Sequence, residues 1–248
     1  MQSGLGCNEN MIPKKIHYCW FGGSEKPKSV EKCIASWRKF FPDYEIKEWN
    51  ESNYDVYQNS FSEYCYKNKK WAFVSDFARL AIINQEGGIY FDTDVEVIKK
   101  PEFLQQDIDG FFGFETDDYI ATGLGFGANK NNSLVQEMIA EYQNQKKNSE
   151  GIYILKSCPQ LNSSALEKCG VKLNGLTQRI GNNLILAADY MNPYDDPTGR
   201  LNITENTFSI HWYTKSWMSR RTILRSQITR PFHRIFGVDC FEWIKKKS

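Results

Sequence analysis

Apolar residues recur along the chain with two alternating periods, which predict strands and helices in turn. The segment KKIHYCW (14–20) is an apolar run closed by the turn signal FGGSEKP, and it predicts a strand. Residues 29–41 place apolar side chains at helical spacing, and 44–49 alternate as a second strand. A strand, a helix and a strand with short connectors form a βαβ unit, which implies parallel pairing and an α/β fold.

The rest of the chain continues this alternation. Residues 69–88 predict a helix that is apolar on nearly every face and ends at a glycine, so we expect it to be buried. Strands are expected at 89–95, 110–115, 119–128 and 184–193, and helices at 132–145, at 158–170 and from 218, the last broken near Pro231. No repeat or low-complexity segment interrupts the pattern. We therefore expect one domain over 11–217, preceded by a leader at 1–10 that is flexible or foreign to the natural chain.

Composition narrows the class of protein. The charged fraction of 25% is ordinary for a soluble domain, while the aromatic fraction of 15% indicates either stacking surfaces or simply a large core. The sequence contains no run of 18 apolar residues, so no transmembrane helix is expected. The first ten residues lack the apolar centre of a signal peptide. The seven cysteines form no close pair, which argues against a disulfide framework and a zinc site and favours reduced thiols in a cytoplasm.

Charge is spread unevenly along the chain. The net charge is +1, but residues 215–248 hold nine Lys or Arg against two acidic residues. A basic, aromatic, helical tail at 218–248 is therefore expected, packed on the domain or extending it. Such a tail suits a membrane surface, an anionic substrate or nucleic acid, and it also suits a plain solvated helix.

Two acidic residues stand where a buried strand is expected to end. In a strand, residues two apart point to the same side, so Asp92 and Asp94 can converge on one cation, and carboxylate oxygens suit Mg²⁺ and Mn²⁺. Acidic pairs are also common in surface turns, so this motif alone decides little. Asp76 and Arg79 share one face of the buried helix, either as a structural ion pair or as part of a polar site.

Three segments together carry a family resemblance. IPKKIHYCWFGG (12–23), SDFARLAIINQEGGIYFDTDV (75–95) and NTFSIHWYTKSW (206–217) resemble the DXD-containing glycosyltransferases that include bacterial capsular polysaccharide sugar transferases and the yeast initiating mannosyltransferase. They are also similar to the glucosyltransferase domain of the large clostridial toxins. The resemblance implies a single-domain GT-A type fold that binds a nucleotide sugar, with a mixed, mostly parallel central sheet.

The resemblance also implies a metal and a donor site. Mn²⁺ or Mg²⁺ would be held by Asp92, Asp94 and His211. The residues implied to contact the nucleotide sugar are Cys19, Trp20, Asp76, Arg79, Tyr90, Asp92, Ser216 and Trp217. The catalytic centre would comprise Asp76, Arg79, Asp92 and Asp94.

Chemistry gives these assignments independent reasons. A nucleoside diphosphate leaves with developing negative charge, which a metal stabilises and to which Lys215 can add. A nitrogen ligand from His211 favours Mn²⁺ over Mg²⁺. Taken singly, Trp20 would be interpreted as a core residue and His211 as a surface or hydrogen-bonded histidine. His17 is expected to be structural. Only the joint pattern indicates a site.

The expected activity is metal-dependent transfer of a hexose from a nucleotide sugar, preferably a UDP-sugar, to a glycan acceptor. The acceptor expected is a lipid-linked O-antigen or capsule repeat unit at the cytoplasmic face of the membrane, to which the tail would bind peripherally. We expect the anomeric configuration of the donor sugar to be retained by a front-face mechanism. No nucleic-acid partner is expected. Where relatives often show a Gly-Pro turn, this chain has SCPQLN (157–162), so donor and acceptor specificity stay open there.

Other functions remain to be weighed. A GDP-mannose-dependent mannosyltransferase and a toxin-like protein glycosyltransferase are the enzymatic alternatives. A phosphatase of the haloacid dehalogenase type needs Thr or Val two residues after the second aspartate, where this chain has Glu96. A catalytically inactive sugar-binding relative would explain the aromatic residues but has no need of the whole constellation.

Overall fold

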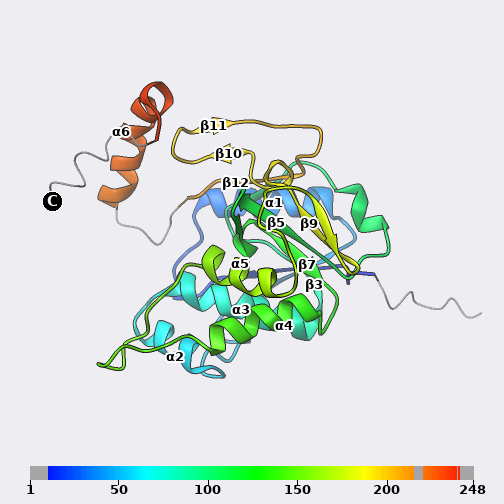
Figure 1. Cartoon of the computed structure of the whole chain (residues 1–248), viewed down its shortest axis with the longest axis vertical. Helices are drawn as coiled ribbons and strands as arrows, with labels where there is room; N and C mark the ends of the chain where they lie inside the picture. The colour runs from blue at the N-terminus through cyan, green and yellow to red at the C-terminus, as the bar shows by residue number, and fades with distance from the viewer. Residues whose placement is uncertain (1–10, 215–219, 239, 241–248) are drawn as a thin grey trace, which may run out of the picture.

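A computed structural model describes residues 11–214, 220–238 and 240 of the chain, so the expected leader at 1–10 lies outside the described residues (Figure 1). The helices are α1 (Lys28–Phe40), α2 (Ser60–Lys67), α3 (Trp71–Glu86), α4 (Ser133–Gln143), α5 (Cys158–Lys168) and α6 (Arg220–Phe236). The strands are β1 (Lys15–Cys19), β2 (Glu45–Trp49), β3 (Gly88–Tyr90), β4 (Val95–Val97), β5 (Gly110–Thr116), β6 (Tyr119–Ile120), β7 (Phe126–Ala128), β8 (Gln178–Ile180), β9 (Asn183–Leu186), β10 (Tyr194–Asp195), β11 (Arg200–Leu201) and β12 (Ser209–His211).

One mixed sheet forms the centre of the molecule. Its strand order is β2-β1-β3-β7-β5-β9-β8, with β6 paired to β5. Strands β2, β1 and β3 are parallel neighbours, as are β5 and β9, while β7 and β8 run against their neighbours. Five of the seven strands on this path therefore point the same way. The predicted α/β fold with a mixed, mostly parallel sheet is confirmed, and so is the first βαβ unit.

Helices cover both faces of the sheet (Figure 1). Successive residues of a strand point to opposite faces, so Phe111 belongs to the apolar cluster that contains α1, while Phe112 belongs to the cluster that contains α3, α4 and α5. Both rings are fully buried. The expectation that α3 is buried is confirmed, because its apolar residues face the sheet on one side and α2 and α4 on the other.

A pair of glycines sets the spacing between α3 and the sheet. Gly87 caps α3 with a φ of 64°, and Gly88 follows with a φ of 109°. A Cβ atom on Gly88 would lie 2.8 Å from the Lys15 carbonyl oxygen of β1. Only glycine allows this turn and this close approach, so the pair places the start of β3 directly against β1.

The prediction of one strand over 89–95 is wrong. Strand β3 ends at Tyr90, and the chain turns through the next four residues, where the Val95 amide donates to the Asp92 carbonyl at 3.0 Å. Strand β4 then pairs with β12 in a separate two-stranded sheet. Asp92 and Asp94 therefore lie in a turn, and their convergence comes from that turn and not from strand alternation.

Other boundaries differ from the predictions for local reasons. The strand expected at 119–128 is divided into β6 and β7 by a 3-10 turn and by Gly125, whose φ is 114°. The strand expected at 184–193 ends at Leu186, and α2 was not predicted. The expected break at Pro231 is wrong, since α6 continues through it. Proline removes one helical hydrogen bond, and contacts from Arg230 and Arg234 hold the helix on both sides of it.

His17 is structural, as expected. Its ring is fully buried in β1, where the Nε2 atom lies 2.9 Å from the Gly87 carbonyl oxygen and the Nδ1 atom accepts a 3.0 Å hydrogen bond from Trp49 Nε1. Because the tryptophan can only donate, Nδ1 must stay unprotonated and Nε2 carries the proton. Burial accordingly lowers the pKa of His17 to about 4.

This histidine predicts how stability depends on pH. Its pKa is about 6.5 in the unfolded chain and about 4 in the fold, so the unfolded state binds more protons between these values. Its contribution is fully present above pH 6.5 and is lost as the pH falls toward 4, by at most about 3 kcal/mol. Urea unfolding of the wild type and of His17→Gln at several pH values tests this. Equal pH slopes for the two proteins would contradict it.

Candidate active site

A cavity of about 490 Å³ opens where several strands end. Its walls come from the ends of β1, β3, β5 and β12, from one face of α3 and from the start of α5. The lining residues that the sequence predicted are Cys19, Trp20, Asp76, Arg79, Asp92, Asp94 and His211. Ligands in open α/β sheets gather at the carboxyl ends of the strands, and this cavity has that position.

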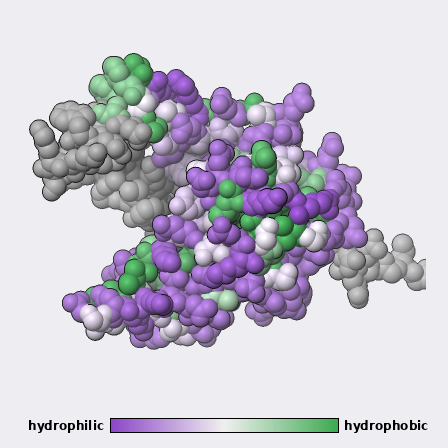
Figure 2. Space-filling view, in the orientation of Figure 1, coloured by the Kyte–Doolittle hydropathy of each residue, from purple (hydrophilic) through white to green (hydrophobic). Residues whose placement is uncertain are grey.

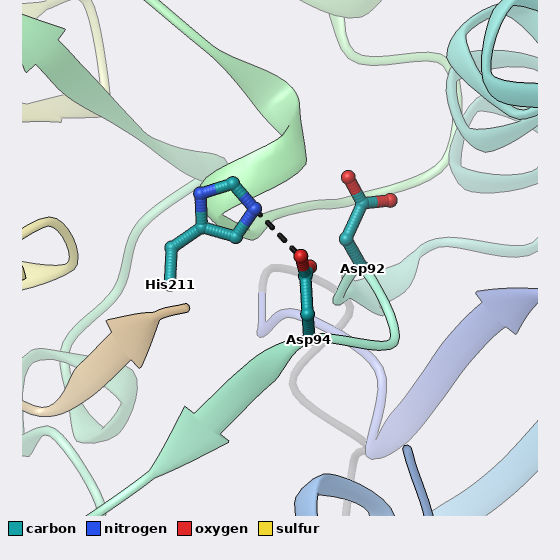
Figure 3. A group of neighbouring side chains, drawn as sticks. All are labelled: Asp92, Asp94 and His211. Atoms are coloured by element: carbon teal, nitrogen blue, oxygen red, sulfur yellow. Dashed lines mark ion pairs between the residues drawn. The ribbon is translucent and has the colours of Figure 1, made fainter. Parts of the chain in front are cut away.

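Asp92, Asp94 and His211 converge in this cavity from two distant parts of the chain (Figure 3). The two aspartates come from the turn between β3 and β4, and the histidine ends β12. Each offers a ligand atom within 4.8 Å of the others, and His211 Nε2 lies 3.1 Å from Asp94 Oδ1. Pairing of β12 with β4 sets this approach, because His211 lies opposite Val95.

Asp92 belongs to a buried charge network with Arg79 at its centre. Arg79 Nη2 lies 2.6 Å from Asp76 Oδ1 and 3.3 Å from Asp92 Oδ1, and Tyr90 donates its hydroxyl proton to Asp92 at 2.9 Å. Only 4% of the Arg79 side chain is exposed. The predicted Asp76–Arg79 pair is therefore present, and it orients one carboxylate of the metal cluster.

Asp94 is held by the segment that follows β12. Its Oδ2 atom accepts hydrogen bonds from the Thr214 amide at 2.9 Å and from the Thr214 hydroxyl at 3.2 Å. Burial alone would raise the pKa of Asp94, but His211 and the Thr214 donors outweigh it and hold that pKa well below the usual value. Burial opposes charge on His211, yet Asp94 raises the histidine pKa overall.

Asp76 and Asp92 are less readily charged than Asp94. Burial raises the pKa of Asp76 to about 6 and raises the pKa of Asp92, in both cases against the opposing effect of Arg79. The guanidinium itself would lose charge through burial, but Asp92 and Asp76 together hold its pKa well above the usual value. The two neighbouring carboxylates thus have different partners, Arg79 and Tyr90 at Asp92, and His211 and Thr214 at Asp94.

The side chains present fit a divalent cation. Oxygen and imidazole nitrogen ligands of this kind suit Mn²⁺ and Mg²⁺. Ligands about 2.1 Å from an ion and at right angles to each other are about 3 Å apart, close to the 3.1 Å between Asp94 Oδ1 and His211 Nε2. Among the described residues the cavity carries four carboxylates against one guanidinium and one imidazole. This excess of negative charge favours entry of an anionic diphosphate together with a cation.

The predicted donor-contacting residues have different positions. Cys19 and Trp20 line the cavity, and the Trp20 indole donates to the Ser24 carbonyl oxygen at 2.7 Å. Tyr90 does not line it: the side chain is buried beneath Asp92 and bonded to it. Lys215, Ser216 and Trp217 lie outside the described residues.

Sequence reasoning missed several cavity residues, and three of them lie close to the charged side chains. Glu115 lies at the end of β5, Thr214 binds Asp94, and Gly123 lies against Asp92 and Arg79. The position of Glu115 at the carboxyl end of an expected strand was a usable signal. Nothing in the sequence marks Thr214 or Gly123.

A family match accompanies this geometry. Residues 27–109, about a third of the chain, match the family described as "Glycosyltransferase sugar-binding region containing DXD motif". The match identifies this segment, and not the remaining two thirds of the chain, with the DXD-containing glycosyltransferases. The matched segment contains α3, Arg79 and both aspartates, but His211 lies about a hundred residues beyond it.

Solved structures offer only distant likenesses. The PaToxG glycosyltransferase is 20% identical, over 63% of this chain and 69% of its own, with a TM-score of 0.46. A glycosyltransferase involved in glycosylation of the major capsid of PBCV-1 is 13% identical, over 88% and 99%, with a TM-score of 0.47. The galactosyltransferase LgtC, in complex with donor and acceptor sugar analogues, is 11% identical, over 88% and 94%, with a TM-score of 0.45. No curated protein matches the chain.

Gly123 gives a direct test of the site. A Cβ atom there would lie 2.8 Å from Asp92 Oδ2 and 3.1 Å from Arg79 Nη1, so Gly123→Ala should displace the aspartate from the cluster. We expect the affinity for Mn²⁺ together with nucleoside diphosphate to fall about tenfold, or about 1.4 kcal/mol, by titration calorimetry. The unfolding temperature of the ligand-free protein should change little. Unaltered affinity would show that Asp92 need not hold its present position.

Proposed function

We propose that this protein transfers a hexose from a nucleoside-diphosphate sugar to a glycan acceptor, with a divalent cation bound in the cavity. The observation that carries the proposal is the convergence of Asp92, Asp94 and His211 in a cavity that also contains a buried arginine. The sequence favours a UDP-sugar, with GDP-mannose as the second candidate. Mn²⁺ is favoured over Mg²⁺ because one ligand atom is a nitrogen.

Each cavity residue has a proposed task. Asp92, Asp94 and His211 would hold the metal, which when bound supplies positive charge to the leaving diphosphate. Arg79, fixed by Asp76, would contact the donor sugar and its phosphate. Trp20 lines the cavity and would stack on the base. Tyr90 would act through Asp92, whose carboxylate it orients, and not by touching the donor.

The proposed reaction retains the anomeric configuration. In a front-face substitution the acceptor oxygen bonds to the anomeric carbon on the side from which the diphosphate departs. The bond to the diphosphate breaks with its electron pair, and the hydroxyl proton passes to the departing oxygen. Asp76 and Asp92 are occupied by Arg79, and Asp94 by His211 and Thr214, so these aspartates are poorly placed to form a covalent sugar intermediate.

We also propose that residues 11–217 form the catalytic unit and that 218–248 bind a membrane bearing a lipid-linked O-antigen or capsule acceptor. No helix among the described residues has both the length and the apolar character needed to span a bilayer. The proposal concerns peripheral binding at the cytoplasmic face. The net charge of +7 over residues 215–248 complements an anionic lipid surface.

The orientation of α6 supports membrane binding. Arg230 forms a 2.8 Å ion pair with Asp196, and Arg234 donates to the Gly199 carbonyl oxygen at 2.9 Å, so the charged face of the helix faces the loop joining β10 and β11. Leu224, Ile228 and Ile235 lie within roughly 40° of one another, about 120° around the helix from Arg230 and Arg234, and are more than half exposed. Figure 2 shows apolar surface over α6, at the upper left.

A transfer assay tests the proposed activity. Wild-type protein with Mn²⁺ should release UDP or GDP from one of a panel of nucleotide sugars, and Asp92→Asn and Asp94→Asn should each lower the rate at least a hundredfold. A control substitution at an exposed position, Ile203→Gln, should leave the rate unchanged. NMR of the released sugar, taken at early times, should show the donor's own anomer. Full activity without any divalent cation would contradict the proposal.

Vesicle binding tests the role of α6. Ile228→Glu combined with Ile235→Glu should abolish co-sedimentation with vesicles containing anionic phosphatidylglycerol, because two charges would enter the apolar face. Ile203→Glu adds the same kind of charge at a similarly exposed position outside α6 and should leave binding unchanged. Equal vesicle binding by the wild type and the double variant would contradict this role.

A further inference from the structure

The cavity contains a fourth carboxylate, Glu115, whose surroundings differ from those of the three aspartates. Asp76 and Asp92 are both paired with Arg79, and Asp94 is paired with His211. Within the part of the chain that the structure describes, no Lys, Arg or His lies within ion-pair distance of Glu115. Among the cavity carboxylates of the described chain, Glu115 is therefore the one without an ion-pair partner.

Only one of the two carboxylate oxygens of Glu115 accepts a hydrogen bond from the described residues. Its Oε1 atom accepts the Tyr213 hydroxyl proton at 3.0 Å, while Oε2 has no hydrogen-bond partner among the described residues. The side chain is half-buried and lines the cavity. An anionic oxygen exposed to a binding cavity accepts hydrogen bonds and cannot donate them, so the ligand group that suits it is a hydroxyl.

Tyr213 holds this carboxylate in place at a cost in backbone strain. Its φ of 49° is in the left-handed region, which is uncommon for a bulky residue. The conformation is held by the Glu115 hydrogen bond at one end of the ring and by the His211 ring, whose centroid is 4.1 Å from that of Tyr213. Strain of this kind persists where the surroundings impose it, and it gathers at functional sites.

These contacts place Glu115 on the His211 side of the metal cluster. The Arg79–Asp76 pair lies on the opposite, Asp92 side. Under the proposed function, the diphosphate leaves from the metal cluster and the sugar lies toward Arg79. A front-face reaction needs the attacking hydroxyl beside the leaving oxygen, and Glu115 lines the same cavity as the three residues of the candidate metal cluster.

We propose that Glu115 binds the attacking hydroxyl group and fixes its approach beside the leaving diphosphate. This inference rests on the proposed function. The hydroxyl donates its hydrogen bond to Glu115 Oε2 in the bound state. As the oxygen bonds to the anomeric carbon, the carbon–diphosphate bond breaks with its electron pair and the hydroxyl proton passes to the departing oxygen. Glu115 remains a carboxylate throughout and acts by orientation.

Hydrolysis of the donor provides the probe, since water is the simplest hydroxyl nucleophile. The full chain with Mn²⁺ is assayed on UDP-glucose, UDP-galactose, UDP-N-acetylglucosamine and GDP-mannose. Glu115→Gln keeps the shape of the side chain, but its amide oxygen could still accept a hydrogen bond from the hydroxyl. Glu115→Ala removes both oxygens and therefore excludes that substitute contact. Both should lower kcat at least tenfold while the donor KM changes less than twofold.

Tyr213→Phe is the matched control, because it removes the hydrogen bond to Glu115 but keeps the carboxylate. It should lower kcat less than either Glu115 variant. A kcat within twofold of wild type in both Glu115 variants would overturn the inference. The inference would also be overturned if the Glu115 variants and Tyr213→Phe all lost Mn²⁺-dependent nucleotide binding. That result would mean that Glu115 acts by positioning His211. If the wild type hydrolyses none of the four donors, the proposed function fails and the inference fails with it.

Discussion

The site depends on keeping two aspartates charged and close together in a largely buried turn. Like charges within 4.8 Å of each other repel by at least about 3 kcal/mol at an effective dielectric constant of about 20. The fold offsets this repulsion from two directions. Arg79 approaches Asp92 from the buried helix α3, and His211 approaches Asp94 from β12. Each aspartate has its own positive partner, so neither has to move away from the other.

This arrangement joins segments far apart in the chain. The aspartates and Arg79 come from one continuous stretch, whereas His211 and Thr214 arrive more than a hundred residues later. Antiparallel pairing of β12 with β4 brings the later segment in, and the Trp212 amide donates to the Asp94 carbonyl oxygen at 3.0 Å. The family match ends at residue 109, so the matched region supplies the acidic residues but not the histidine that completes the cluster.

Sequence patterns predicted the fold well where periodicity and burial agree. The helical spacing over 69–88 gave α3 within two residues at each end, because a helix that is apolar all round has only the core to occupy. The same reasoning failed at 89–95, since three apolar residues before the acidic pair do not reveal that the chain leaves the sheet there. Strand alternation was the wrong reason for bringing Asp92 and Asp94 together, although the expected convergence is present.

The site residues that sequence patterns did not predict are those whose roles depend on contacts between distant loops. Glu115 shares its sequence signal, a position at the end of an expected strand, with other acidic residues, and its hydrogen bond from Tyr213 is seen only in the structure. Gly123 matters because of the side chains above it, which no local pattern records. Motifs thus located Asp92, Asp94 and His211 of the candidate metal cluster, and tertiary structure was needed for the residues that surround them.

Thermal unfolding with and without ligands tests the central claim most directly, namely that the cluster binds a divalent cation together with a nucleoside diphosphate. Mn²⁺ with either UDP or GDP, at about 100 times the dissociation constant, should stabilise the fold by about 2.7 kcal/mol. For a chain of this size the unfolding temperature should then rise by several degrees. The nucleotide without Mn²⁺ should give a much smaller shift. Equal shifts with and without the metal, or no shift with either nucleotide in a folded sample, would contradict the account.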